Sequence, residues 1–251
     1  MAQKTALVTG AAAGIGAACA RRLAKDGMQV GVLDLDAARC AETVASIQAA
    51  GGKAIALGAD ISDRAQVKAA LAQLREAFGP IAVLVNNAAI TGYVPFLDMT
   101  DQQWNDIHRV NLTGTFIVTQ EVLPGMVAAK WGRVINIASS AAQTGAKNMA
   151  HYASSKGGMI ALTRSLAVEF GPSGITTNVI PPRFITATIM SEHSFANAKQ
   201  PMSREALAAA GPICREGQPE DIAGTVSWLA SEDAGFVTGQ VIGVNGGRII
   251  A

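Results

Sequence analysis

Residues 5–16 read Thr-Ala-Leu-Val-Thr-Gly-Ala-Ala-Ala-Gly-Ile-Gly, and this stretch decides the fold class. Its first four residues predict a short buried strand, and the glycine-rich turn that follows opens directly into a helical stretch. Glycines let the backbone turn tightly or approach a pyrophosphate, which would then lie at the positive end of the helix. An ordinary strand-to-helix turn could carry the same glycines, but the position after the first strand favours a dinucleotide site. The residues expected to contact the dinucleotide there are Gly10, Ala13, Gly14, Ile15 and Gly16.

Short β-branched or leucine-rich runs alternate with alanine-rich helical stretches along the whole chain. The predicted strands are Thr5–Val8, Gln29–Leu33, Ala54–Leu57, Ile81–Val85, Arg133–Ile137, Ile175–Ile180 and Val241–Val244. The predicted helices between them include Gly16–Asp26, Ala37–Ala49, Arg64–Phe78 and Tyr152–Phe170, with Asp63 and Asp101 as N-caps. This alternation predicts an α/β fold, a Rossmann-type doubly wound parallel sheet of about seven strands with helices on both faces. Ligands are then expected beyond the carboxyl ends of the strands.

Composition limits the function further. The 251 residues suit a single dinucleotide-binding and catalytic domain over 1–251, and the proline-bearing stretch at about 183–216 is expected to be a substrate lid. Lys plus Arg (20) nearly balances Asp plus Glu (19), which argues against nucleic acid as a partner. We expect no membrane partner, because no apolar run is long enough to span one. Three scattered cysteines predict reduced thiols, a cytoplasmic location and no metal site.

The second predicted strand runs up to Asp34. A carboxylate at this point can accept hydrogen bonds from both hydroxyls of an adenosine ribose, whereas the 2′-phosphate of NADP would meet its negative charge. Neither Leu35, the next residue, nor Ala13 in the glycine turn offers a compensating base. We therefore predict NAD as the cofactor, contacted by Asp34 and Leu35, with NADP less favoured. Asp34 could instead cap a helix, a role equally open to Asp36.

Polar residues follow the third and fourth predicted strands. Asp60-Ile61 comes after the third, and Asn86-Asn87-Ala88-Ala89 comes after the fourth. Either loop could simply form a turn in which the Asp or Asn side chain caps the next helix. Their joint occurrence at the expected ligand-binding edge favours contact with the adenine and its ribose. The residues predicted to contact the cofactor here are Asp60, Ile61, Asn87, Ala88 and Ala89.

Tyr152 and Lys156 are spaced i, i+4 at the start of a long predicted helix, so their side chains share one face. A tyrosine with a pKa of about 10 is a poor acid or base near neutrality, and a neighbouring ammonium would lower that pKa. The pair alone is common in helices. Two further residues make it specific: Ser139, just beyond the fifth strand, and Asn111, within a predicted helix.

With the glycine turn, the Asn86–Ala89 loop and a C-terminal Val244-Asn245-Gly246-Gly247, these residues make the chain resemble the short-chain dehydrogenase/reductase family along essentially its whole length. The resemblance implies that Tyr152 exchanges a proton with the substrate oxygen and that Ser139, rather than the adjacent Ser140, holds this oxygen. It further implies that Lys156 binds the nicotinamide ribose and lowers the pKa of Tyr152. Asn111 would hold a water that links Lys156 to solvent.

The family also has a Pro-Gly turn after the sixth strand, followed by residues that hold the nicotinamide amide. The resemblance carries this role to Pro182, Ile185 and Thr188, but Arg183 stands where the glycine is usual. An arginine adopts a positive φ less readily than glycine, so either the turn differs locally or strain is tolerated. Arg183 could bind an anionic substrate group at the mouth of the pocket, or it could lie on the surface.

These observations predict an NAD-dependent oxidoreductase that interconverts a secondary alcohol and a ketone, with a small-molecule substrate. Two other functions stay open: a 3-oxoacyl thioester reductase of the acyl-carrier-protein type, and a non-catalytic dinucleotide-sensing module. The resemblance also implies a homotetramer. The residues expected to line an apolar substrate pocket are Ala89, Ile90, Tyr93, Val94, Phe96, Phe184 and Met190.

Overall fold

The computed structural model describes residues 3–186, 206, 209 and 211–250. Its centre is a six-stranded parallel sheet in the order β3-β2-β1-β4-β5-β6, which confirms the predicted doubly wound architecture. The strands are β1 Thr5–Thr9, β2 Gln29–Asp34, β3 Lys53–Gly58, β4 Ile81–Asn86, β5 Gly132–Ile137 and β6 Ile175–Ile180. The strand order reverses between β1 and β4, so the ligand-binding crevice of such a sheet is expected at their carboxyl ends.

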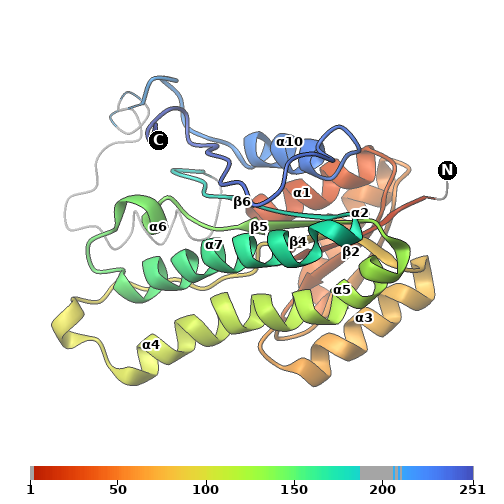
Figure 1. Cartoon of the computed structure of the whole chain (residues 1–251), viewed down its shortest axis with the longest axis horizontal. Helices are drawn as coiled ribbons and strands as arrows, with labels where there is room; N and C mark the ends of the chain where they lie inside the picture. Colours follow the sequence, from red (N-terminus) through yellow and green to blue (C-terminus); the bar gives the residue numbers. More distant parts are fainter. Residues whose placement is uncertain (1–2, 187–205, 207–208, 210, 251) are drawn as a thin grey trace.

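Helices cover both faces of this sheet (Figure 1). Their bounds are α1 Gly14–Lys25, α2 Ala41–Ala49, α3 Arg64–Phe78, α4 Asp101–His108, α5 Thr115–Ala129, α6 Ala141–Thr144, α7 Ala150–Phe170 and α10 Pro219–Leu229. Short 3₁₀ turns span Ala37–Cys40, Phe96–Asp98 and Gly171–Ser173. A π-helical segment, Arg109–Gly114, joins α4 to α5 without a break.

Two apolar layers hold the helices to the sheet, because alternate strand residues point to opposite faces. On one face, Val30 and Val32 of β2 share a buried cluster with Leu23 of α1 and Leu229 of α10. On the other, the buried leucines and valines of the strands meet α3 and α5 through Leu71, Leu74, Val118 and Val122. Full burial of one such side chain contributes about 1.5–3 kcal/mol to the stability of the fold, so these layers hold the helices firmly on the sheet.

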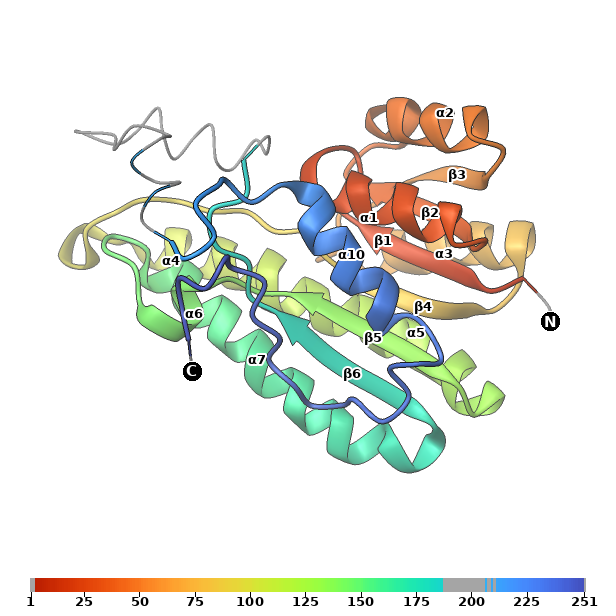
Figure 2. The same ribbon diagram turned by 90° about the horizontal axis from the view of Figure 1, so that it is seen from above.

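The predicted seventh strand, Val241–Val244, is not a strand in the structure. Only Val241 pairs with the sheet, through an isolated parallel bridge to Val179 of β6. The chain turns away soon afterwards because Gly246 and Gly247 adopt positive φ angles of 65° and 77°. In Figure 2 the C-terminal segment accordingly runs beside β6 as a coil.

Helix starts were predicted with mixed success. Asp63 caps α3 as expected, accepting hydrogen bonds from the Ala65 and Gln66 amides. Asp101 was predicted to cap the next helix, but it is the first residue of α4, and Thr100 is the cap. The reason is a reciprocal pair of bonds, in which the side chains of Thr100 and Gln103 each accept from the other's backbone amide.

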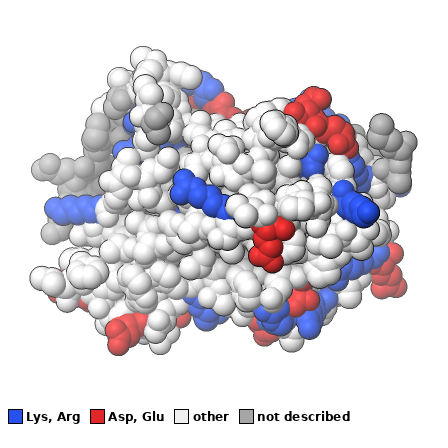
Figure 3. Space-filling model, in the orientation of Figure 1, with Lys and Arg blue, Asp and Glu red and all other residues white. Residues whose placement is uncertain are grey.

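On the face in Figure 3, lysine and arginine are scattered among acidic and uncharged side chains. Within the described part of the chain, no helix is long and apolar enough to cross a membrane. No group of three or more His, Cys, Asp or Glu side chains that could hold a metal occurs among the same residues. The expected lid at about 183–216 lies largely outside the described residues, as do Thr188 and Met190.

Candidate active site

The glycine turn after β1 is fastened to the loop after β4. The Asn87 side-chain amide donates to the carbonyls of Thr9 and Gly10, both at 3.0 Å. Gly10 has a φ of 63°, and a Cβ there would lie 2.8 Å from the Cα of Ala88. Asn87 and Ala88 therefore pack against the backbone of the turn and hold its shape. Their contact with a cofactor stays a prediction.

The start of α1 fits a pyrophosphate. Its N-cap is Ala13, no side chain caps the helix among the described residues, and the first turn has no acidic residue. Gly14 bends the chain into the helix with a φ of 56°. The first-turn amides thus lack the side-chain acceptor that usually satisfies them, which leaves them for an anion at the positive end of the helix.

Asp34 lies at the end of β2 as predicted, but it is not alone there. Its carboxylate accepts from the Leu35 amide at 2.9 Å and from the Ala12 amide of the glycine turn at 3.4 Å. It also pairs with the Arg39 guanidinium at 3.0 Å. We expected no compensating base at this position. The 3₁₀ turn Ala37–Cys40 supplies one, because it folds Arg39 back toward the strand end.

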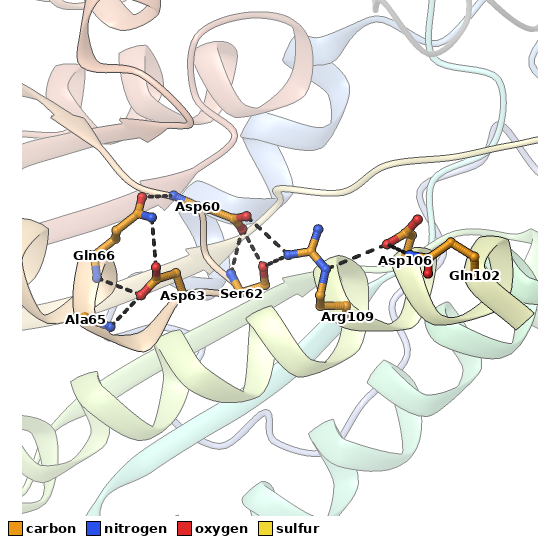
Figure 4. Close-up of polar contacts among 8 residues, drawn as sticks. All are labelled: Asp60, Ser62, Asp63, Ala65, Gln66, Gln102, Asp106 and Arg109. Carbon is orange, nitrogen blue, oxygen red and sulfur yellow. Dashed lines mark hydrogen bonds and ion pairs between the residues drawn. The ribbon is translucent and has the colours of Figure 1, made fainter.

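Asp60, at the end of the third strand's loop, belongs to a chain of polar contacts that crosses to the π-helical segment (Figure 4). Its carboxylate accepts from the amide of Ser62 at 2.9 Å and from its hydroxyl at 2.6 Å, and it pairs with Arg109 at 3.2 Å. Burial acts to raise the pKa of Asp60, but the bonds from Ser62 and Arg109 outweigh it and hold the pKa below its usual value. Ile61 packs against Gly114. The predicted adenine loop is therefore tied to both ends of the π-helical segment.

The four residues predicted for catalysis lie near one another at the carboxyl end of β5. Tyr152 and Lys156 occupy the first turns of α7 and are buried, with 5% and 1% exposure. Ser139 follows β5 and hydrogen-bonds with Tyr152. The adjacent Ser140 is buried, and its amide donates to the Pro182 carbonyl at 3.0 Å. Ser139 is thus the serine that meets the tyrosine.

Asn111 is fully buried in the π-helical segment. Its side-chain oxygen accepts from the Ile90 amide at 2.8 Å, and its side-chain nitrogen donates to the Ile90 carbonyl and to the Ser155 hydroxyl. These bonds fix the loop after β4 against α7. The water-holding role implied by the resemblance stays a prediction.

The ionisation of the tyrosine and lysine differs from expectation. We expected Lys156 to lower the pKa of Tyr152, but burial raises the pKa of Tyr152 to about 12, and the Ser139 hydrogen bond offsets only part of this rise. Burial also lowers the pKa of Lys156 to about 7. The cause is that both groups lose water, while the Lys156 Nζ donates to the Ile137 carbonyl at 2.8 Å and lies 6.0 Å from the tyrosine ring centroid.

In the loop after β6, Arg183 does not adopt the positive φ that the usual glycine would allow. The positive φ falls on the next residue, Phe184, at 54°, so the turn is displaced by one residue. A left-handed conformation costs a non-glycine residue about 1–2 kcal/mol. Ile185 is buried and bridges to Gly217, which holds the loop beside the start of α10.

Comparison with known proteins agrees with this geometry. A family model described as enoyl-(acyl carrier protein) reductase matches residues 10–248. The chain is 39% identical to a (2S)-[(R)-hydroxy(phenyl)methyl]succinyl-CoA dehydrogenase subunit of Thauera aromatica, over 98% of this chain and 96% of that one. It is 38% identical to a 3-oxoacyl-[acyl-carrier-protein] reductase of Staphylococcus aureus, over 97% of each chain.

The chain belongs to the short-chain dehydrogenase/reductase family. A solved structure of a proposed gluconate dehydrogenase from Agrobacterium tumefaciens superposes with a TM-score of 0.92 at 32% identity, covering 98% of this chain and 96% of that one. As a short-chain dehydrogenase/reductase, the protein is an oxidoreductase that uses a nicotinamide dinucleotide and acts on small molecules.

Three arginines of this short-chain dehydrogenase/reductase were missed in the sequence. Arg39 and Arg109 touch the predicted cofactor residues Asp34 and Asp60, and Arg248 lies over the ring of Phe184, 5.3 Å from its centroid. The sequence around these arginines does not predict their partners, because each arginine reaches its partner only through tertiary folding or a local turn.

Proposed function

We propose that this protein is an NAD-dependent enzyme that interconverts a secondary alcohol and a ketone, with Tyr152 as the general acid and base. The observation that carries the proposal is the buried group of Tyr152, Ser139 and Lys156 at the carboxyl end of β5. It lies on the sheet edge that also bears the uncapped start of α1. The intact group argues against a purely dinucleotide-sensing role.

The chain's own residues supply proton transfer and alignment. The Tyr152 oxygen takes the hydroxyl proton in alcohol oxidation and returns it in ketone reduction, while the Ser139 hydroxyl holds the same substrate oxygen. A bound nicotinamide supplies the hydride acceptor or donor. Holding these groups in line replaces an encounter in solution, a gain that can reach about 7–11 kcal/mol.

Lys156 is suited to proton exchange near neutrality. With a pKa of about 7, its amine populates both charged and neutral forms at physiological pH. We assign the charged form to stabilising the phenolate of Tyr152 and to holding the nicotinamide ribose. Asn111 keeps the neighbouring loop in place through Ile90.

The predicted apolar wall is brought together only in part, because Phe184 lines a different cavity and Phe96 is exposed. Tyr93 and Val94 border a cavity of about 190 Å³ that Ile107 and His151 also line. The second candidate, a 3-oxoacyl thioester reductase, is favoured by the Staphylococcus aureus relative and by Arg39, which gives a 2′-phosphate a base that the sequence did not suggest. By resemblance we also propose a homotetramer in the cytoplasm.

The test is an activity screen with the purified protein. Cyclic, aromatic and aliphatic secondary alcohols are oxidised with NAD, and the matching ketones and a 3-oxoacyl thioester are reduced with NADH, by following absorbance of the reduced cofactor. The whole panel is then repeated with NADP and NADPH. Turnover of simple alcohols with NAD supports the proposal, and a preference for NADP of tenfold or more overturns the cofactor assignment.

Cofactor choice is expected to depend on the balance between Asp34 and Arg39. In Asp34→Asn, the Arg39 guanidinium loses its carboxylate partner and can pair with a 2′-phosphate, so the ratio of kcat/KM for NADP to that for NAD should rise by about 10- to 100-fold. Adding Arg39→Ala should remove most of this gain. An unchanged ratio in Asp34→Asn would show that the carboxylate does not select the cofactor.

A further inference from the structure

A cavity of about 320 Å³ lies beyond β6, next to the loop that bears Phe184. Most of its lining comes from residues 183–185 after β6, residues 213–217 before α10 and residues 243–248 of the C-terminal segment, and Asp221 of α10 completes it. In Figure 2 the C-terminal segment runs along β6 toward α6, and so comes near the loop that follows β6. No residue of the glycine turn, the predicted pyrophosphate site, lines this cavity.

The side chains that line this cavity carry an excess of positive charge. Arg215 is neutralised by Asp221, with two contacts of 2.6 Å. Arg183 and Arg248, in contrast, form no salt bridge and no side-chain hydrogen bond with any described residue. Two guanidinium groups in one cavity that no described carboxylate pairs suit an anion, since planar N–H donors bind carboxylate or phosphate oxygens strongly.

Arg248 is held in place by contacts other than charge. Its guanidinium carbon lies 5.3 Å from the centroid of the Phe184 ring, and its stem packs against Gly211, where an added Cβ would approach to 2.9 Å. The left-handed turn at Phe184 therefore places an aromatic ring under a cation at the wall of the cavity. This arrangement leaves the N–H edge of the guanidinium available.

The same cavity contains a hydrogen-bond acceptor that lacks a donor. The Oε1 atom of Glu216 is buried, and no described residue donates to it. A buried acceptor left unpaired costs about 1–3 kcal/mol, so a ligand that brings a hydroxyl donor would relieve this cost. The two arginines can bind an acid group, and the Glu216 carboxylate can accept a hydrogen bond from a hydroxyl group. A ligand that fits both is a hydroxylated acid.

A backbone contact joins the wall of the cavity to the proposed reaction centre, although Ser139, Tyr152 and Lys156 do not themselves line the cavity. The Pro182 carbonyl accepts from the Ser140 amide at 3.0 Å, and Ser139 hydrogen-bonds with Tyr152. Arg183 follows Pro182 directly. A molecule whose acid group binds Arg183 would therefore lie beside the loop that contacts the Ser139–Ser140 pair.

We propose that Arg183 and Arg248 bind the acid group of a small hydroxy acid or oxo acid substrate, and that Glu216 accepts a hydrogen bond from one of its hydroxyl groups. This inference rests on the proposed alcohol–ketone interconversion and narrows its substrates to anionic ones. Arg183 and Arg248 are then specificity-determining residues, because they favour a charged substrate over a neutral one of the same shape.

Turnover gives the first test. NADH-linked reduction of 5-oxohexanoate is compared with that of 2-heptanone, which replaces the carboxylate by an ethyl group. The wild type should prefer the acid by at least tenfold in kcat/KM, Arg183→Ala with Arg248→Ala should abolish the preference, and lysine at both positions should restore part of it. Arg21→Ala, which removes an exposed charge on α1, is the matched control and should keep the wild-type ratio.

Binding gives a test that needs no turnover. Glycerate, glycerol and propanoate are titrated into NADH-loaded protein by calorimetry. Glycerate should bind the wild type most tightly, should weaken at least tenfold in the double arginine variant, and should lose its advantage over propanoate in Glu216→Met.

The outcomes separate this inference from the proposed function. Reduction of 2-heptanone as efficient as that of 5-oxohexanoate overturns the anion site and leaves the function standing. Loss of glycerate binding in the arginine variants, with no ketone reduced, supports the anion site and overturns the proposed reaction. Absence of glycerate binding to the wild type overturns the anion site.

Discussion

Replacing Tyr152 by Phe is expected to lower kcat in both directions by about 10²- to 10⁴-fold, the range that positioned proton transfer contributes. The change removes a single oxygen from a side chain that is 5% exposed, so the packing of α7 should persist. The measurement is steady-state turnover with the best substrate from the screen, together with titration of NADH by fluorescence. Cofactor affinity should change little.

Ser139→Ala and Ser140→Ala form a matched pair for the same site. Ser139 meets Tyr152, so its loss should also lower kcat, whereas the Ser140 hydroxyl is not assigned to the substrate and its backbone amide survives the change. The proton-transfer scheme fails if Tyr152→Phe keeps turnover within tenfold of the wild type.

The lowered pKa of Lys156 predicts that the stability of the fold depends on pH. Lys156 is buried with a pKa of about 7, well below its unfolded value of about 10.4, so between these values the unfolded chain binds more protons than the folded one. Stability must therefore rise with pH in that window. Between pH 7 and pH 9 the lysine should add about 2 kcal/mol to the free energy of unfolding. Lys156→Met should lack this increase.

The measurement is urea unfolding of wild type and Lys156→Met at several pH values from 7 to 9. Burial also raises the pKa of Cys19 to about 12 and that of Cys40 to about 11, and these thiols oppose the trend as pH approaches and passes 9. Both proteins retain them, so the difference between the two curves isolates the lysine. Parallel curves would mean that the lysine keeps an ordinary pKa in the fold.

Much of the fold could be predicted because its signals are local. Apolar runs and glycine turns located all six strands of the sheet to within a residue or so at each end. At Val241–Val244 the residues have strand propensity, but the structure pairs them with β6 only through the bridge from Val241 to Val179, and the chain then turns at Gly246 and Gly247. Thr100 displaced Asp101 as a cap because Gln103 completes a reciprocal pair that favours the threonine.

The candidate site was predictable only in part. Motif spacing predicted Tyr152, Lys156 and Ser139 as site residues, and the fold brings them together. The partners that modify the site come from elsewhere in the chain: Arg109 reaches Asp60 across 49 residues of sequence. The pKa of Tyr152 likewise depends on how much water the finished fold excludes, which spacing along a helix does not report.

The π-helical segment makes the placement of Asn111 a matter of chain length. A π turn closes its hydrogen bond one residue later than an α turn, so it behaves as a helix with one residue inserted. Deleting any residue between Arg109 and Gly114 would let the helix from α4 to α5 become regular and would remove the bulge that places Asn111 beside Ile90. The asparagine amide would then swing away from Ile90, even with every side chain of the site conserved. Insertions and deletions, more than substitutions, are therefore the changes that this helix should tolerate least during evolution.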